Sequence, residues 1–214
     1  MKPIVCYVTD RKALGATDQV GSLLAKIRRA QTAGVDWVQV RERDMPAQEL
    51  LTLASAAIGV HQGEAHILVN DRLDVALAAG ASGVHLGRAS VPAREAVRWL
   101  RKGNAPAEFL IGVSCHGMEE AREAEDAGAS YVFFGPVFDT PSKKSYGPPQ
   151  GTQRLDQVCS AVRIPVIAIG GVNEQNATQC VRAGAAGIAA IRMFQELREA
   201  ETLEQAVARL HGDR

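Results

Sequence analysis

Charged and amide side chains gather in the segment Gln-Val-Arg-Glu-Arg, residues 39–43, which follows a short apolar run. Strand alternation would place Gln39, Arg41 and Arg43 on one face of a strand. Two guanidinium groups on one face need an anion nearby, because charges are almost never buried without partners. That anion is either a carboxylate of the protein or a phosphate of a ligand. The segment therefore predicts a salt-bridged interior or an anion-binding site.

Asp71 stands in the sequence Asn70-Asp71-Arg72, where an apolar run turns into a helical pattern. Its carboxylate could cap that helix by accepting hydrogen bonds from the first N–H groups. It could equally hold Mg²⁺, which usually takes one or two carboxylates together with substrate phosphates. In combination with the arginine pair, Asp71 favours a diphosphate site.

A hydroxyl and an imidazole follow another apolar run, at Ser114 and His116. The serine could hold phosphate, and the histidine could exchange protons near neutral pH. Ser114-Cys115-His116 superficially resembles a nucleophile–base pair, but adjacent side chains rarely reach each other, which argues against a cysteine hydrolase. His85 ends a different apolar run, and a lone histidine there is more often a core residue with its hydrogen bonds satisfied.

The longest irregular stretch, residues 138–151, contains three prolines and two glycines. A loop of this length in a compact domain is usually functional, and we interpret it as a lid. It carries Thr140 and the adjacent cations Lys143 and Lys144. The lysines would suit a solvated loop, but over a cationic mouth they would be repelled unless an anionic ligand lay between. We therefore expect Thr140 and Lys143 to contact such a ligand.

A motif that begins Ala-Gly recurs four times, with its glycine at Gly34, Gly80, Gly128 and Gly184. In each copy an alanine-rich amphipathic stretch ends at a glycine that can adopt the left-handed C-cap conformation, and an apolar β-rich run follows at once. The spacing of 46 to 56 residues is too long for one strand–helix unit but suits two. The intervening strands are expected at 4–9, 66–70, 109–114 and 165–169.

Four junctions with two units each predict eight parallel strands in a single α/β domain over residues 1–214, a (β/α)8 TIM barrel. Functional residues of such barrels lie on the loops after the C-terminal ends of the strands. A doubly wound sheet would also alternate strands with helices, but it gives no reason for a fourfold recurrence.

The runs 168–172 and 187–191 end the seventh and eighth predicted strands, where barrels commonly bind phosphate on backbone amides and a helix N-terminus. The residues concerned are Gly170, Gly171, Gly187 and Ile191. Together with the arginine and aspartate cluster, they give two anion sites facing one cavity. This arrangement indicates group transfer between a diphosphate and a monophosphate substrate.

The composition excludes several classes of protein. Lys+Arg and Asp+Glu number 24 each, so the formal net charge is zero and the basic footprint of nucleic-acid binding is missing. No stretch approaches the roughly 18 apolar residues of a membrane span, and the N-terminal apolar run is too short for a signal sequence. We expect a cytoplasmic protein without nucleic-acid or membrane partners. Four scattered cysteines without C-x-x-C spacing predict reduced, mostly buried thiols, and the oligomeric state stays open.

Taken together, these residues resemble the thiamine phosphate synthase and thiazole tautomerase superfamily over essentially the whole chain. The matching segments, in family order, are 6–10, 39–43, 69–72, 83–87, 112–114, 135–138 with Lys143, and 168–171. In the synthase, the resemblance implies that Mg²⁺-bound hydroxymethylpyrimidine diphosphate loses pyrophosphate and the thiazole phosphate nitrogen captures the resulting cation. By that analogy the diphosphate is held by Gln39, Arg41, Arg43, Asn70, Ser114 and Lys143, Mg²⁺ by Asp71, and the thiazole phosphate by Gly170 with residues 187–191.

Two departures from the family pattern favour the tautomerase branch: Arg43 replaces a usual lysine, and Ser90 replaces a second magnesium-binding aspartate. In that branch a proton shift aromatises a carboxylated thiazole phosphate, and a histidine at the position of His116 acts as acid and base. Retention of the diphosphate residues favours the synthase, with Asp71 and Ser90 at the metal. A barrel that binds thiazole or thiamine phosphates without catalysis is a further hypothesis. Arg192 replaces a usual small hydroxyl residue near the predicted phosphate-binding residues at Gly170, Gly171 and 187–191, which we call the phosphate cup.

Overall fold

The computed structural model describes residues 2–60, 65–140, 148–196 and 200–212. Its eight strands form a closed barrel in which every strand is parallel to its neighbours and β8 pairs with β1. The strands are β1 (Ile4–Val8), β2 (Trp37–Val40), β3 (His66–Asn70), β4 (Gly83–Leu86), β5 (Leu110–Cys115), β6 (Tyr131–Phe134), β7 (Val166–Ile169) and β8 (Gly187–Ala190). The predicted single-domain TIM barrel is confirmed.

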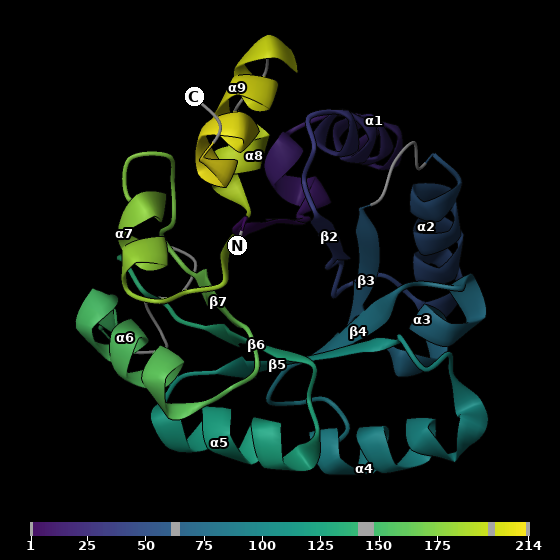
Figure 1. Cartoon of the computed structure of the whole chain (residues 1–214). Coiled ribbons are helices and arrows are strands. Elements are labelled where there is room, and N and C mark those ends of the chain that lie inside the picture. Colours follow the sequence, from purple (N-terminus) through teal and green to yellow (C-terminus); the bar gives the residue numbers. More distant parts are fainter. Residues whose placement is uncertain (1, 61–64, 141–147, 197–199, 213–214) are drawn as a thin grey trace.

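Helices surround the barrel as a ring (Figure 1). They are α1 (Gln19–Thr32), α2 (Ala47–Gly59), α3 (Leu73–Ala79), α4 (Ala93–Trp99), α5 (Met118–Ala127), α6 (Gly151–Ala161), α7 (Ala177–Arg182), α8 (Arg192–Glu196) and α9 (Ala200–His211). A short 3₁₀ turn, η1 (Arg11–Leu14), follows β1, and a π-helical turn, η2 (Leu100–Asn104), extends α4.

The four predicted helix-to-strand junctions are present. Gly80 and Gly128 are the left-handed C-caps of α3 and α5, with φ of 69° and 89°. A side chain with a Cβ rarely adopts this conformation, so glycine ends the helix and lets the next strand begin three residues later. The four strands predicted between the junctions agree with the structure to within one residue at each end.

The core has two layers. Inside the barrel, one cluster fills the lumen, and it consists of Cys6, Val8, Trp37, Leu68, Tyr131, Phe133, Ile167 and Ala189. A larger cluster lies between the strands and the helices. Alternation along each strand produces this division. Because the lumen is packed, a cavity large enough for a ligand lies at an end of the barrel.

Gly112 on β5 makes room for the Tyr131 ring in the lumen. A Cβ at this position would lie 2.1 Å from Tyr131 Cζ. The Tyr131 ring in turn packs on Trp37, with ring centroids 4.6 Å apart. Glycine is therefore required here by close approach of a neighbouring ring.

All four cysteines are free, and Cys6, Cys115 and Cys180 are buried, as the sequence predicts. Burial raises the pKa of Cys115 to about 12 and that of Cys159 to about 11. These thiols therefore stay protonated at neutral pH, which agrees with the argument against a cysteine nucleophile.

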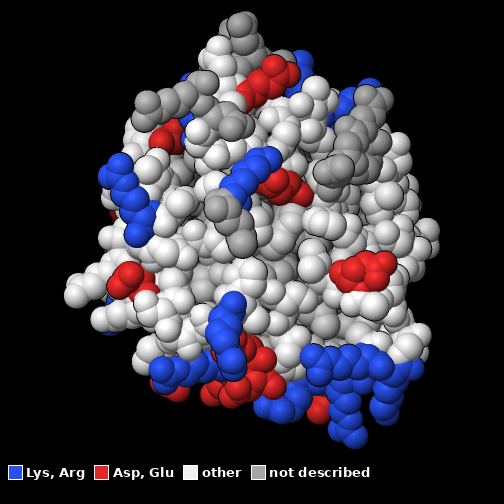
Figure 2. All heavy atoms as spheres, in the orientation of Figure 1, with Lys and Arg blue, Asp and Glu red and all other residues white. Residues whose placement is uncertain are grey.

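Charged side chains of both signs share the surface. On the face in Figure 2, Lys and Arg gather at the lower right, over α4 and η2, with acidic side chains beside them. The neighbouring α5 begins with Glu119 and Glu120. In the described part of the chain, no helix is long and apolar enough to cross a membrane.

Candidate active site

A cavity of about 760 Å³ opens at the C-terminal ends of the strands. Its walls come from the ends of all eight strands or the loops after them, as expected for a TIM barrel. The predicted residues among its lining are Gln39, Arg41, Arg43, Asn70, Asp71, Ser114, His116 and Ile191. The structure thus brings together residues that lie up to 152 positions apart in the sequence.

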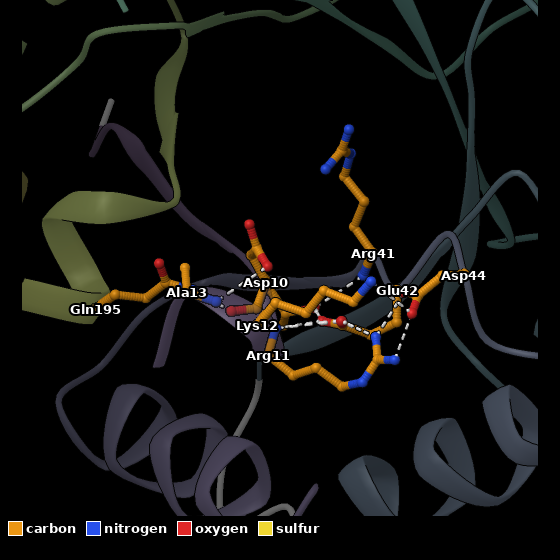
Figure 3. Close-up of polar contacts among 9 residues, drawn as sticks. Asp10, Arg11, Lys12, Ala13, Arg41, Glu42, Asp44 and Gln195 are labelled. Atoms are coloured by element: carbon orange, nitrogen blue, oxygen red, sulfur yellow. Dashed lines mark hydrogen bonds and ion pairs between the residues drawn. The ribbon is translucent and has the colours of Figure 1, made fainter. Parts of the chain in front are cut away.

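The segment after β2 differs from the prediction of one continuous strand. β2 ends at Val40, and Glu42 turns into the protein, where it is 4% exposed. Thr9 Oγ1 donates a hydrogen bond of 2.6 Å to Glu42 Oε1, and Arg11 Nη1 donates one of 2.9 Å to Glu42 Oε2 (Figure 3). The salt-bridged interior that the sequence left open therefore exists, but Arg11 supplies its guanidinium.

Arg41 points away from this network in Figure 3 and lines the cavity together with Arg43. The Thr9 hydroxyl accepts the Arg41 N–H at 2.9 Å, which ties the arginine backbone to Glu42. Burial, and then the neighbouring Arg43, lower the pKa of Arg41. Among the described residues neither arginine forms an ion pair, so the arrangement favours an anionic ligand.

Asp71 does not cap a helix, so that alternative is wrong. The N-cap of α3 is Arg72, and its side chain makes no capping hydrogen bond within the described part of the chain. Asp71 has a positive φ of 62°, and its carboxylate accepts from Asn70 Nδ2 at 2.8 Å and from the Gly87 N–H at 3.2 Å. Ser90 Oγ also contacts Asp71 Oδ1. Asp71 and Ser90, 19 residues apart, therefore meet at the rim of the cavity.

Gln39 and Asn70 form the floor beside Asp71. Gln39 Nε2 donates to Asn70 Oδ1 at 2.9 Å, and both side chains are buried. This bond orients the Asn70 amide so that its NH₂ faces Asp71. A chain of three polar side chains thus fixes the carboxylate.

His85 is the satisfied, buried histidine that the sequence predicts, at 2% exposure. Sequence reasoning missed that it also reaches a candidate site residue, because His85 Nε2 lies 2.9 Å from Ser114 Oγ. Tyr131 Oη lies 3.2 Å from the other ring nitrogen. The sequence signal for this packing was Gly112, because a glycine within a strand often marks a place where a neighbouring group, here the Tyr131 ring, approaches the backbone closely.

His116 lies at the edge of the same cavity. Its backbone N–H donates to Glu120 Oε2 at 2.5 Å, and its Nδ1 lies 3.4 Å from the same oxygen. Sequence reasoning missed this contact, although a spacing of four residues at the start of a helix was the available signal.

The predicted phosphate cup is only partly where the sequence placed it. In the described part of the chain, the N–H groups of Gly170 and Gly171 donate to no backbone carbonyl, as an anion cup requires. Ile191 lines the cavity. Gly187, however, is the first residue of β8 and pairs with Ile4, which puts it at the opposite end of the barrel. Its prediction as a phosphate ligand is wrong, because the rest of β8 lies between Gly187 and the mouth.

Thr140 is buried, and its Oγ1 accepts a hydrogen bond of 3.2 Å from Arg192 Nη2. Arg192, which follows β8 and departs from the family pattern, is therefore hydrogen-bonded to the loop after β6. Lys143 and Lys144, the cations of the predicted lid, lie outside the described residues.

A closed parallel barrel with polar and charged residues around its C-terminal mouth defines a (β/α)8-barrel enzyme. The sequence narrows this class, because the sequence model described as thiamine monophosphate synthase matches residues 5–194. The chain belongs to that family.

The names of similar proteins agree with this assignment. A thiamine-phosphate synthase of Roseiflexus sp. is 40% identical over 189 residues, which cover 88% of this chain and 76% of the relative. A thiamine-phosphate synthase of Chlorobium luteolum is 37% identical, and the alignment covers 97% of this chain and 91% of the relative. The solved structure of thiamine phosphate pyrophosphorylase from Pyrococcus furiosus has a TM-score of 0.84 and 29% identity, covering 98% and 96% of the two chains. A 3-hexulose-6-phosphate synthase at 17% identity, with a TM-score of 0.71, shares the fold alone.

Proposed function

We propose that this chain is a thiamine-phosphate synthase, which joins hydroxymethylpyrimidine diphosphate to thiazole phosphate and releases pyrophosphate. The observation that carries the proposal is the pair Arg41 and Arg43, which line the cavity without an ion pair among the described residues and lie around it with Asp71. A monophosphate isomerase would not need such a group. The names of the relatives support the same reaction.

The two substrates would lie at different sides of the mouth. Gln39, Asn70 and Ser114 would hold the pyrimidine, with the arginines and Lys143 on its diphosphate. The cup at Gly170 and Gly171, with Ile191, would hold the thiazole phosphate, and Thr140 would lie beside it.

Catalysis then requires no nucleophilic side chain. The bond between the pyrimidine methylene carbon and the diphosphate oxygen breaks, and its electron pair leaves with the diphosphate. The lone pair of the thiazole nitrogen forms the new bond to that carbon. Arg41 and Arg43 would stabilise the charge that builds up on the departing diphosphate, where a water-poor site makes such stabilisation most effective.

The residues around Asp71 fit Mg²⁺ that is shared with a diphosphate. Among the described residues, Asp71 Oδ2 accepts a single hydrogen bond, from Asn70, and can serve as a ligand. Ser90 Oγ is in contact with the other oxygen. No group of three His, Cys, Asp or Glu side chains suited to a metal occurs among the described residues, so the diphosphate and water would complete the shell. When bound, Mg²⁺ would neutralise charge on the diphosphate.

The proposal is tested by incubating the purified protein with both substrates, with and without Mg²⁺, and measuring thiamine phosphate after oxidation to thiochrome. We expect product that depends on Mg²⁺. Asp71→Ala should abolish product while thiazole phosphate still binds, and the matched control Asp74→Ala, at an exposed carboxylate paired with Arg72, should leave turnover unchanged.

Three outcomes would contradict parts of the proposal. Unchanged turnover in Asp71→Ala would refute the metal assignment. No product, with proton exchange on a carboxylated thiazole phosphate that stops in His116→Ala, would establish the tautomerase instead. Ligand binding without turnover of either substrate set would establish a non-catalytic binding barrel.

A further inference from the structure

Three hydrogen-bonded side chains run beneath the floor of the cavity, from Tyr131 through His85 to Ser114. Tyr131 Oη lies 3.2 Å from His85 Nδ1, and His85 Nε2 lies 2.9 Å from Ser114 Oγ. The three residues belong to β6, β4 and β5. Ser114 and His85 line the cavity, whereas Tyr131 belongs to the packed lumen. The chain therefore connects the interior of the barrel with the substrate site.

Burial decides the direction of the first hydrogen bond. Tyr131 is 1% exposed, and burial raises the pKa of its hydroxyl well above the ordinary value, so the phenol keeps its proton. Within the described part of the chain, His85 Nδ1 is the single hydrogen-bond partner of Tyr131 Oη. A buried hydroxyl hydrogen without an acceptor is unfavourable. Tyr131 therefore donates to His85 Nδ1.

The direction of the second bond follows from the tautomer of the imidazole. A ring nitrogen that accepts a hydrogen bond carries no hydrogen, so an imidazole that accepts from Tyr131 at Nδ1 is neutral. The apolar ring of Phe133, whose centroid lies 4.2 Å away, agrees with a neutral His85. A neutral imidazole that accepts at Nδ1 carries its hydrogen at Nε2. Nε2–H then donates to Ser114 Oγ, and the hydrogen of the serine hydroxyl is free to point into the cavity.

We propose that Tyr131 and His85 are positioning residues that make Ser114 a hydrogen-bond donor to an acceptor atom of the substrate. The identity of that substrate, the pyrimidine diphosphate, rests on the proposed function, but the tautomer does not. With the opposite tautomer of His85, Ser114 would donate its hydroxyl hydrogen to His85 Nε2 and could only accept a hydrogen bond from the ligand. The chain of contacts would thus select a ligand with an acceptor, such as a diphosphate oxygen or an unprotonated ring nitrogen, at this place.

The tautomer can be measured directly by ¹⁵N NMR of protein labelled at histidine, with the His85 resonances assigned by their loss in His85→Gln. We expect an unprotonated Nδ1 and a protonated Nε2. Tyr131→Phe should shift this distribution toward the other tautomer. The matched control Tyr7→Phe removes a hydroxyl from a buried tyrosine that packs on Phe194, and it should leave the His85 signals unchanged. A protonated Nδ1 in the unaltered protein would overturn the proposal, whether or not thiamine phosphate is made.

Kinetics test whether the chain acts through the serine. Tyr131→Phe should lower kcat/KM for the pyrimidine diphosphate by about tenfold, the size of one neutral hydrogen bond, whereas Tyr7→Phe should not. In a Ser114→Ala background the same change should alter kcat/KM by less than about twofold. An equal tenfold loss in both backgrounds, with thermal unfolding unchanged, would overturn the proposal. Lack of turnover in the unaltered protein would refute the proposed function, and the NMR result would still decide the tautomer.

Discussion

Replacing Glu42 with glutamine should lower the free energy of unfolding by about 3 kcal/mol. The Glu42 side chain is 2% exposed and Arg11 only 12%, so their 2.9 Å ion pair is mostly removed from water. Glutamine keeps the shape and one acceptor oxygen for Thr9, but it removes the charge and turns an NH₂ group toward the N–H groups of Arg11. Altering one partner of a buried pair costs about 3–5 kcal/mol. The lower end applies because Arg11 keeps its two hydrogen bonds to Asp44.

Urea unfolding followed by circular dichroism measures this effect. With a denaturant slope of about 3 kcal/mol/M, at the upper end for single domains, the midpoint should fall by about 1 M. The matched control is Glu95→Gln, which removes an exposed pair with Arg98 at 3.9 Å and should change stability by less than about 0.5 kcal/mol. A midpoint shift for Glu42→Gln no larger than that of the control would refute the reasoning that burial makes this pair important.

Two further predictions concern the lumen and the thiols. Gly112→Ala should destabilise the protein by about 1–3 kcal/mol, because the new methyl must displace the Tyr131 ring, and urea unfolding measures this. The control Gly59→Ala should be neutral or slightly stabilising, because its new Cβ would have no described atom within 4 Å. Equal stability of the two variants would show that the Tyr131 ring can move to accommodate the methyl group without loss of packing. Because burial raises the pKa of Cys115 to about 12, its reactive thiolate forms only as the pH rises toward that value, so iodoacetamide should not label Cys115 at pH 7 until the protein is unfolded. Rapid labelling in the native protein, detected by mass spectrometry of its peptides, would show that the end of β5 opens.

The architecture was predictable because its signals are local. A glycine C-cap such as Gly80, followed at once by a short apolar run, defines a helix end and a strand start without reference to distant residues. The four copies then set the number of strands. The placement of Gln39, Asn70 and Ser114 at the mouth followed from the rule that sites lie after the C-terminal ends of barrel strands.

Gln39, Arg41 and Arg43 line one cavity as the alternation predicted, but the extent of β2 and the position of Gly187 differ from the prediction. Strand alternation could not foresee that β2 ends at Val40 and that Glu42 turns inward toward Arg11, 31 residues earlier in the sequence. Gly187 belongs to the strand that reaches the cup, but it starts that strand at the far end of the barrel.

The sequence by itself determined the barrel, the family and most of the residues around the mouth, because repeats, caps and apolar runs encode local structure. Only the tertiary structure decided what each polar group does. The partners of His85 lie 46 and 29 residues away, and Asp71 meets Ser90 across 19 residues instead of capping its own helix. Hydrogen bonds between strands depend on how the barrel closes, and closure is a property of the whole chain that no single segment contains.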